Sequence, residues 1–169
     1  GDTIQTVVYN YETGQFDTVM AYKEFSIRSL AVDHDHNLWA AAYYYDGSDY
    51  TGAVKMYDGD HWTAFTPADG LIDSLVNCIA VDMLGNIWFG SNNGVSKYDH
   101  SSWTNYTMED GLISNHVSSI TADSSGAIWF GTSAGASRFD GYSWTNFTKN
   151  DGLISDGIFS LFTDTSGNV

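Results

Sequence analysis

Short apolar stretches separated by turn residues recur along the chain at an interval of 41 residues. "NIWFG" (86–90) and "AIWFG" (127–131) each begin four residues after an aspartate, Asp82 or Asp123. Apolar residues also lie three and six positions before these aspartates. No stretch keeps a helical period over ten residues. Apolar stretches this short, bounded by turn residues, predict β-strands throughout.

Further columns keep the same spacing, which is the mark of a repeat architecture. "DHDHNLW" (33–39) aligns with the two later aspartate turns, although an insertion of eight residues follows it. Three other features each occur three times at intervals of 41 residues: a tryptophan, the triplet "DGL", and an aromatic residue followed by aspartate. The tryptophans are Trp62, Trp103 and Trp144, the triplets lie at 69–71, 110–112 and 151–153, and the aromatic residues are Tyr57, Tyr98 and Phe139.

Each repeat predicts four short antiparallel strands, as in "NCIAVD" (77–82), "NIWFG" (86–90), "GVSKYD" (94–99) and "SWTNYT" (102–107). Four strands in about 40 residues are typical of a β-propeller blade. Small side chains suit the crowded innermost strand, and large aromatic residues suit the wedge between blades. We therefore predict an all-β fold: a β-propeller of four-stranded antiparallel blades, with about four blades present.

The predicted domain organisation is one propeller domain or propeller segment over residues 1–169. The repeats are placed at about 27–75, 76–116 and 117–157, and residues 158–169 together with 1–26 could complete one further blade. Two alternatives stay open: a small ring closed by its own termini, or a segment of a larger propeller.

Two stretches carry a family resemblance. "VNCIAVDMLGNIWFGSNNGVSKYD" (76–99) and "VSSITADSSGAIWFGTSAGASRFD" (117–140) resemble the two-component regulator propeller repeat, as do the trailing "WTNYTMEDGLISN" and "WTNFTKNDGLISD". The resemblance implies a bacterial, extracellular or periplasmic module that serves as the sensor part of a membrane-bound histidine kinase. The first repeat departs from the pattern by its insertion and by losing the glycine after the tryptophan.

Charge excludes some partners. Six basic and 21 acidic residues give a formal net charge of −15, which repels phosphate backbones and anionic lipid surfaces. We therefore expect no nucleic-acid partner. We also expect no membrane insertion, because no apolar run approaches the roughly 20 residues that cross a bilayer. The single cysteine, Cys78, cannot form an internal disulfide and is predicted to be a small core residue.

The cluster "DHDHN" (33–37) could coordinate a metal or form a polar turn. His34 and His36 fall where a later repeat has Met83 and Gly85, which have no ligand chemistry. A calcium loop would also need a glycine and a downstream glutamate that are missing here. We predict a turn and assign no metal or other cofactor, with calcium binding as the alternative.

The insertion "YYYDGSDYTG" (43–52) breaks the repeat on the face where propellers bind ligands. Tyrosine offers a flat apolar ring with a hydrogen-bonding tip, a surface suited to sugars or peptides. The alternative is a loop whose aromatic residues cover a neighbouring blade. The predicted ligand-binding residues in this segment are Tyr43, Tyr44, Tyr45, Asp46, Asp49 and Tyr50.

Arg28 and Asn77 are added to the candidate ligand-binding residues. With Ser118 they occupy a variable column five residues before the aspartate, near the expected central channel. Variation where the neighbouring columns are uniform permits ligand contacts. The alternative is ordinary lining of the channel.

The predicted function is a non-catalytic recognition or sensor module that binds a glycan or small polar ligand. The first alternative is a structural or surface-assembly module that pairs with copies of itself, with other chains or with further blades through open strand edges. A polysaccharide lyase or hydrolase is the weaker alternative, because no nucleophile or metalloenzyme motif occurs in the sequence. No catalytic residue is assigned.

Overall fold

The computed structural model describes the backbone of residues 3–10, 15–22, 26–45 and 50–169, and the side chains of residues 26–43, 45 and 50–169. The predicted all-β fold is confirmed. The strands are β1 (Thr3–Asn10), β2 (Gln15–Tyr22), β3 (Ser26–Val32), β4 (Leu38–Tyr45), β5 (Tyr50–Tyr57), β6 (Trp62–Phe65), β7 (Val76–Val81), β8 (Ile87–Ser91), β9 (Val95–Tyr98), β10 (Trp103–Tyr106), β11 (Val117–Ala122), β12 (Ile128–Thr132), β13 (Gly135–Phe139) and β14 (Trp144–Phe147).

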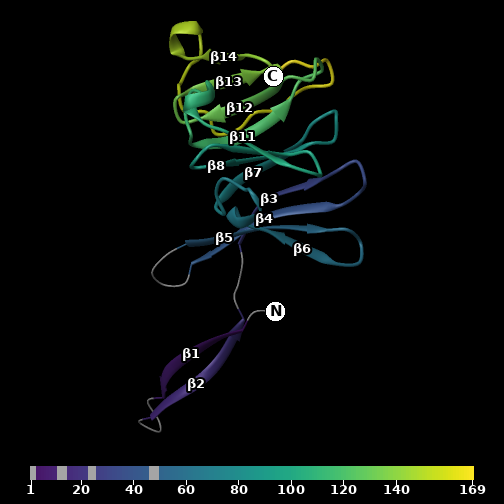
Figure 1. Ribbon diagram of the computed structural model, residues 1–169. Helices are drawn as coiled ribbons and strands as arrows, with labels where there is room; N and C mark the ends of the chain where they lie inside the picture. Colours follow the sequence, from purple (N-terminus) through teal and green to yellow (C-terminus); the bar gives the residue numbers. More distant parts are fainter. Residues whose placement is uncertain (1–2, 11–14, 23–25, 46–49) are drawn as a thin grey trace.

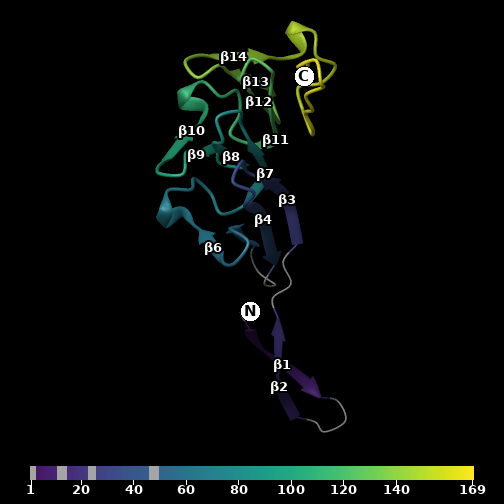
Figure 2. The ribbon, with the colours of Figure 1, turned by 90° about the vertical axis from the view of Figure 1, so that its right-hand side faces the viewer.

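Three antiparallel sheets of four strands follow one another within these ranges. We call them blade 1 (β3–β6), blade 2 (β7–β10) and blade 3 (β11–β14). The blades are stacked in chain order (Figure 1). The first strands β3, β7 and β11 lie along one side of the stack, and β6, β9 and β10 lie along the other (Figure 2). Sheets radiating from adjacent first strands are propeller blades, as the sequence predicted.

Aromatic residues fill the wedges between blades. Trp39 of blade 1 meets Phe89 of blade 2 edge to face, with ring centroids 5.6 Å apart. Trp88 of blade 2 meets Phe130 of blade 3 in the same way at 5.7 Å. Each tryptophan is at the centre of a cluster of buried apolar side chains drawn from two blades. Burial of this apolar surface is the main force that holds one blade to the next.

Hydroxyl groups on the innermost strands also accept hydrogen bonds from the next part of the chain. The Ser29 hydroxyl on β3 accepts from the Ile79 N–H on β7 at 2.9 Å, and Ser119 on β11 accepts from the Leu161 N–H at 2.9 Å. Cys78 occupies the same column on β7 and packs against the core, as predicted. Burial raises the pKa of its thiol to about 12.

Short 3₁₀ helices begin the connections between blades: η1 (Pro67–Asp69), η2 (Met108–Asp110) and η3 (Lys149–Asp151). In η1 the Asp69 carboxylate accepts from the backbone N–H and the hydroxyl of Thr66, both at 2.8 Å. Gly70 follows in the left-handed region, with φ 118°. The aspartates of the "DGL" triplets therefore form turns, as the sequence predicted.

The N-terminal end forms the antiparallel pair of strands expected of half a blade, whereas the C-terminal end differs from the expectation. β1 and β2 form a sheet of two strands, in which Tyr9 lies opposite Phe16 as Tyr98 lies opposite Trp103 in blade 2. Residues 158–169 were expected to contain a strand but have none. They run beside blade 3 without a neighbouring second strand with which to form a ladder. Completion of one blade by the two ends stays a prediction.

Candidate functional site

The turn predicted at 33–37 is confirmed. Asp33 is 4% exposed, and its Oδ1 accepts from the N–H groups of Asp35 at 3.0 Å and Asn37 at 2.8 Å. Its Oδ2 accepts from Asn37 Nδ2 and from Trp39 Nε1, both at 2.9 Å. Burial alone would raise the pKa of Asp33, but these hydrogen bonds outweigh it and lower the pKa. The carboxylate thus anchors the blade's core tryptophan.

The same anchor recurs in blade 3, where Trp129 Nε1 donates to Asp123 Oδ2 at 2.9 Å. Burial opposes ionisation of Asp123, yet hydrogen bonds from Ser125, Trp129 and two backbone N–H groups lower its pKa to about 2. His36 has φ 66°, in the left-handed region where blade 2 has Gly85 at φ 86°. Among the described residues, no three His, Cys, Asp or Glu side chains gather as a metal site requires.

The tyrosine insertion lengthens two strands of blade 1. β4 and β5 have eight residues each, against five in β8 and four in β9. Tyr43 pairs with Gly52, and Tyr45 pairs with Tyr50. Residues two apart on a strand share a face, as do residues directly opposite across a hairpin. Tyr43, Tyr45 and Tyr50 therefore share one face of the hairpin.

The variable column coincides with an irregularity in each innermost strand. The register shifts between Ile27 and Ser29 in β3, and at the equivalent places in β7 and β11. The extra residues are Arg28, Asn77 and Ser118. An extra residue in one strand turns its side chain away from the regular ladder, a device often found beside binding sites.

The structure brings these two predicted sets of residues together. The Arg28 guanidinium carbon lies 4.4 Å from the centre of the Tyr43 ring, and its Nη1 donates to Asn77 Oδ1. The Tyr43 and Tyr50 rings are 5.5 Å apart, and Tyr45 and Tyr50 are 4.9 Å apart. Asn77 Nδ2 in turn donates to Asn92 Oδ1 at 2.9 Å. We call Arg28, Tyr43, Tyr45, Tyr50, Asn77 and Asn92 the recognition cluster.

Asn92 was missed by sequence reasoning, although it lies in "SNNG", the turn of blade 2 that corresponds to the insertion in blade 1. Two predicted residues, Asp46 and Asp49, lie outside the described residues, as does the side chain of Tyr44. Ligand contact by each member of the predicted set stays a prediction.

The cluster offers rings and polar groups on one surface. Tyr45 is 56% exposed and Tyr50 is 52% exposed, while Tyr43 is half-buried between Tyr50 and Arg28. Exposed rings of this kind bind flat apolar surfaces such as the face of a sugar ring, and their hydroxyl groups give the contact direction. Asn77 also has a structural contact, because its Nδ2 donates to the Val117 carbonyl of blade 3 at 3.0 Å.

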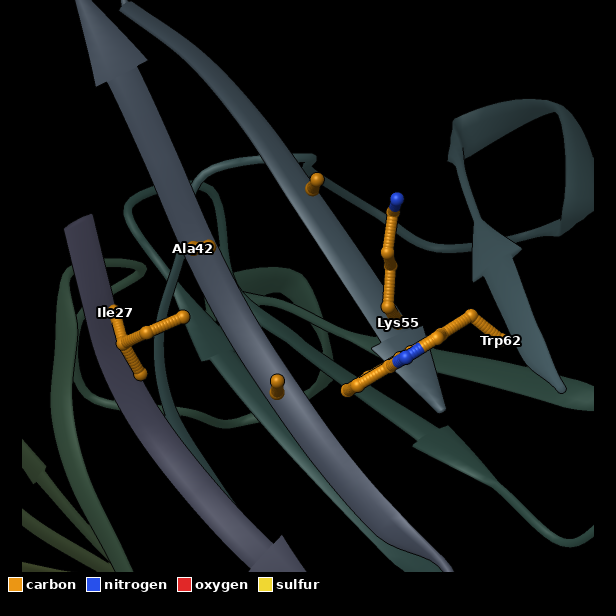
Figure 3. A pocket seen from close by; sticks show the side chains of 6 residues that line it. Ile27, Ala42, Lys55 and Trp62 are labelled. Atoms are coloured by element: carbon orange, nitrogen blue, oxygen red, sulfur yellow. The ribbon is translucent and has the colours of Figure 1, made fainter. Parts of the chain in front are cut away.

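A separate pocket of about 210 Å³ lies on the face of blade 1 that points away from blade 2 (Figure 3). Ile27, Lys55 and Trp62 contribute its larger side chains, and Trp62 is 53% exposed. The rest of the lining is alanine, at Ala40, Ala42 and Ala53.

The equivalent place on blade 2 is filled by the preceding connection. Ile72 N–H donates to Ser96 Oγ at 2.8 Å, and Asn105 Nδ2 donates to the Gly70 carbonyl at 3.0 Å. Leu71 between them is buried. Blade 3 has the same pair of hydrogen bonds to its own connection. Blade 1 has Lys55 and Ala64 in place of this serine and asparagine, so it lacks both.

Comparison with known proteins supports the repeat assignment. Residues 70–93 and 111–134 match the family model described as two component regulator propeller, which confirms the predicted resemblance on these two stretches. No curated protein matches the chain.

Two solved bacterial structures share the fold. One is the extracellular domain of BT3049 from B. thetaiotaomicron, described as a hybrid two component system, with a TM-score of 0.71 and 20% identity over 83% of this chain. The other is PorZ, a bacterial surface component of the type-IX secretion system of Porphyromonas gingivalis, with a TM-score of 0.61 and 19% identity over 90% of this chain. This chain spans 19% and 24% of their lengths. Within the described ranges, no helix is long and apolar enough to cross a bilayer.

Proposed function

We propose that this chain is a non-catalytic recognition part of an extracellular or periplasmic sensor propeller, and that its recognition cluster binds a glycan or another small polar ligand. The observation that carries the proposal is the continuity of the cluster. An insertion found in one blade and the extra residues of two innermost strands meet in one unbroken series of ring and hydrogen-bond contacts.

The recurrent residues do not explain this series. Asp33 and Trp39 anchor the turn and fill the wedge, and the corresponding residues do the same in the other blades. By contrast, the tyrosine hairpin and Arg28 occur in blade 1 alone among the three blades described. Blades 2 and 3 have no such hairpin and still pack on each other through Trp88 and Phe130, so stacking does not require it. A role in recognition accounts for the departure.

Two features of the cluster favour ligand binding. The Tyr45 and Tyr50 rings are exposed on paired strands, so they are positioned by main-chain hydrogen bonds and a ligand need not order them. Asn77 and Arg28 come from adjacent blades, so a bound molecule would touch both. Likeness to an extracellular sensor domain supports the same location and role for this chain.

The proposal is tested by screening the purified chain against neutral and acidic oligosaccharides and short peptides, followed by titration calorimetry. Replacing Tyr45 and Tyr50 by alanine should weaken binding at least tenfold. Tyr142 is 97% exposed on a turn of blade 3, so Tyr142→Ala is the matched control and should leave affinity unchanged. Absence of any ligand at millimolar concentration, or equal effects of the control, would contradict the proposal.

A further inference from the structure

Arg28 is an unusual cation for this chain. Only six residues are basic against 21 acidic ones, so a surface arginine has many carboxylates available to pair with. Arg138, on blade 3, does so and lies 3.4 Å from Asp123. In the part of the chain that the structure describes, no carboxylate oxygen lies within ion-pair distance of Arg28. Its partners are a neutral amide and a tyrosine ring.

These neutral partners fix the guanidinium without cancelling its charge. The guanidinium carbon lies over the Tyr43 ring, and Asn77 Oδ1 accepts from Nη1. A guanidinium has five N–H donors in one plane. One donor is used by Asn77, so the others in the exposed plane can bind an acceptor of matching shape. A carboxylate is such an acceptor, since it takes two parallel N–H donors from one arginine.

The other blades show what this position does without an arginine. Asn77 Nδ2 donates to the Val117 carbonyl of the following blade, and Ser118 Oγ donates to the Ile158 carbonyl. A short neutral side chain therefore serves the contact between blades. Arg28 instead reaches the Asn77 side chain on the ligand-facing cluster. The arginine is thus not required for stacking.

We propose that the ligand of the recognition cluster is an acidic oligosaccharide, in which a uronic acid carboxylate binds Arg28 and the adjoining sugar rings lie on Tyr50 and Tyr45. This inference rests on the proposed function and names the class of ligand. The order Arg28, Tyr43, Tyr50, Tyr45, with steps of 4.4, 5.5 and 4.9 Å, places one cation at the end of a row of rings. An acidic sugar chain offers the matching order of one anion and several rings.

The net charge of −15 sharpens this selectivity. Polyanions are repelled by the chain as a whole, and salt screens that repulsion over about 10 Å at 0.1 M ionic strength. A short oligosaccharide with a single carboxylate, bound at Arg28, is repelled only weakly. Long, densely charged polymers such as nucleic acids are repelled along their whole length.

The test compares short oligosaccharides that carry a single galacturonic, glucuronic or mannuronic acid at the end of a neutral sugar chain with their methyl esters, which have the same rings but no charge. Titration calorimetry should show at least tenfold tighter binding of one acid than of its ester. Arg28→Gln should remove that preference by weakening the acid at least tenfold and the ester less than twofold. Arg28→Lys, which keeps the charge but not the planar pair of donors, should retain part of the preference. Lys149→Gln removes an exposed cation that follows blade 3 and should leave the affinity for both the acid and the ester unchanged.

Failure of this inference can be told from failure of the proposed function. Equal binding of acid and ester, lost on Tyr45→Ala, would overturn the acidic ligand while keeping glycan recognition. An acidic peptide that binds as tightly as the acidic sugar would also overturn it. No binding of any sugar would overturn both. Thermal unfolding of Arg28→Gln checks the fold, and we expect no change because Arg28 is exposed.

Discussion

Asp82→Asn tests the anchor of the core tryptophan most directly. The Asp82 carboxylate is 7% exposed and accepts four hydrogen bonds. Oδ1 accepts from the N–H groups of Leu84 and Asn86, both at 2.9 Å. Oδ2 accepts from Asn86 Nδ2 at 2.7 Å and from Trp88 Nε1 at 2.9 Å. The substitution keeps the shape but turns one oxygen into an NH₂ group, so in either orientation a donor faces two donors.

The expected cost follows from these contacts. Each buried donor left without an acceptor costs about 1–3 kcal/mol. With two such donors in a turn that is nearly closed to water, Asp82→Asn should lower the free energy of unfolding by about 3–4 kcal/mol. Domains are usually stable by only about 5–15 kcal/mol, so this is a large fraction of the total.

Urea unfolding measures the effect, and a double-mutant cycle with Trp88→Phe isolates the bond to the indole. A hydrogen bond to a charged group contributes about 1.5–3 kcal/mol, which is the coupling we expect. Asp164→Asn is the matched control, because Asp164 holds the same turn through Asn168 but is exposed and, among the residues that the structure describes, accepts no hydrogen bond from a tryptophan. Its cost should be much smaller. A coupling near zero between Asp82 and Trp88, or equal costs at Asp82 and Asp164, would refute the anchor.

Three further substitutions test the fold. His36→Gly should raise the free energy of unfolding by roughly 0.5–1 kcal/mol in urea titration, because φ is 66° there and left-handed backbone strains any residue with a Cβ; a loss would contradict this. Gly90→Ala should cost about 2–3 kcal/mol by overpacking, since its Cβ would lie 2.5 Å from Cys78 Sγ and 2.7 Å from Val117 Cγ1, and an unchanged urea midpoint would rule out so tight a contact. The pKa of Asp123 is lowered from 3.8 to about 2, so its contribution is complete above about pH 4 and is lost as pH falls to 2. Asp123→Asn should therefore destabilise by up to about 2 kcal/mol at pH 7 and little at pH 2, and a gap that stays constant with pH would show that ionisation is not the cause.

The blades could be predicted because every structural demand recurs at the same spacing. The spacing of six positions from Asp82 to Trp88 repeats from Asp123 to Trp129, and each pair forms the same hydrogen bond. Repetition shows that such residues are structural, but not which atoms meet. The aspartate was therefore assigned to its turn alone, and its bond to the indole emerged only when the turn was seen to fold back over the core.

The recognition cluster was predicted as two separate candidates. Nothing in the sequence brings Arg28 next to Tyr43, which lies 15 residues later. Their contact depends on the extra residue in β3, and such an irregularity leaves no gap in the repeat because all three innermost strands contain one. The insertion also looked like a loop, since "DGSD" dominates its middle, whereas its tyrosines in fact extend the two strands.

The departures of blade 1 from its neighbours fall into two groups with different causes. Arg28 and the tyrosine hairpin gather at one edge, where they contact each other and where Arg28 contacts Asn77 of blade 2. The second group lies on the face of blade 1 that points away from blade 2. It consists of Ala40, Lys55 and Ala64, at the positions where blade 2 has Phe89, Ser96 and Asn105. The second group removes the hydrogen bonds that receive a "DGL" connection and leaves the pocket of Figure 3. Only three residues separate β2 from β3, which is too few for a "DGL" connection before blade 1. The serine and asparagine that would bind such a connection are therefore not needed in blade 1. The absence of such a connection explains this second group without any ligand. It does not explain the first group, which is why the recognition cluster and not the apolar pocket of blade 1 is the place to look for a ligand.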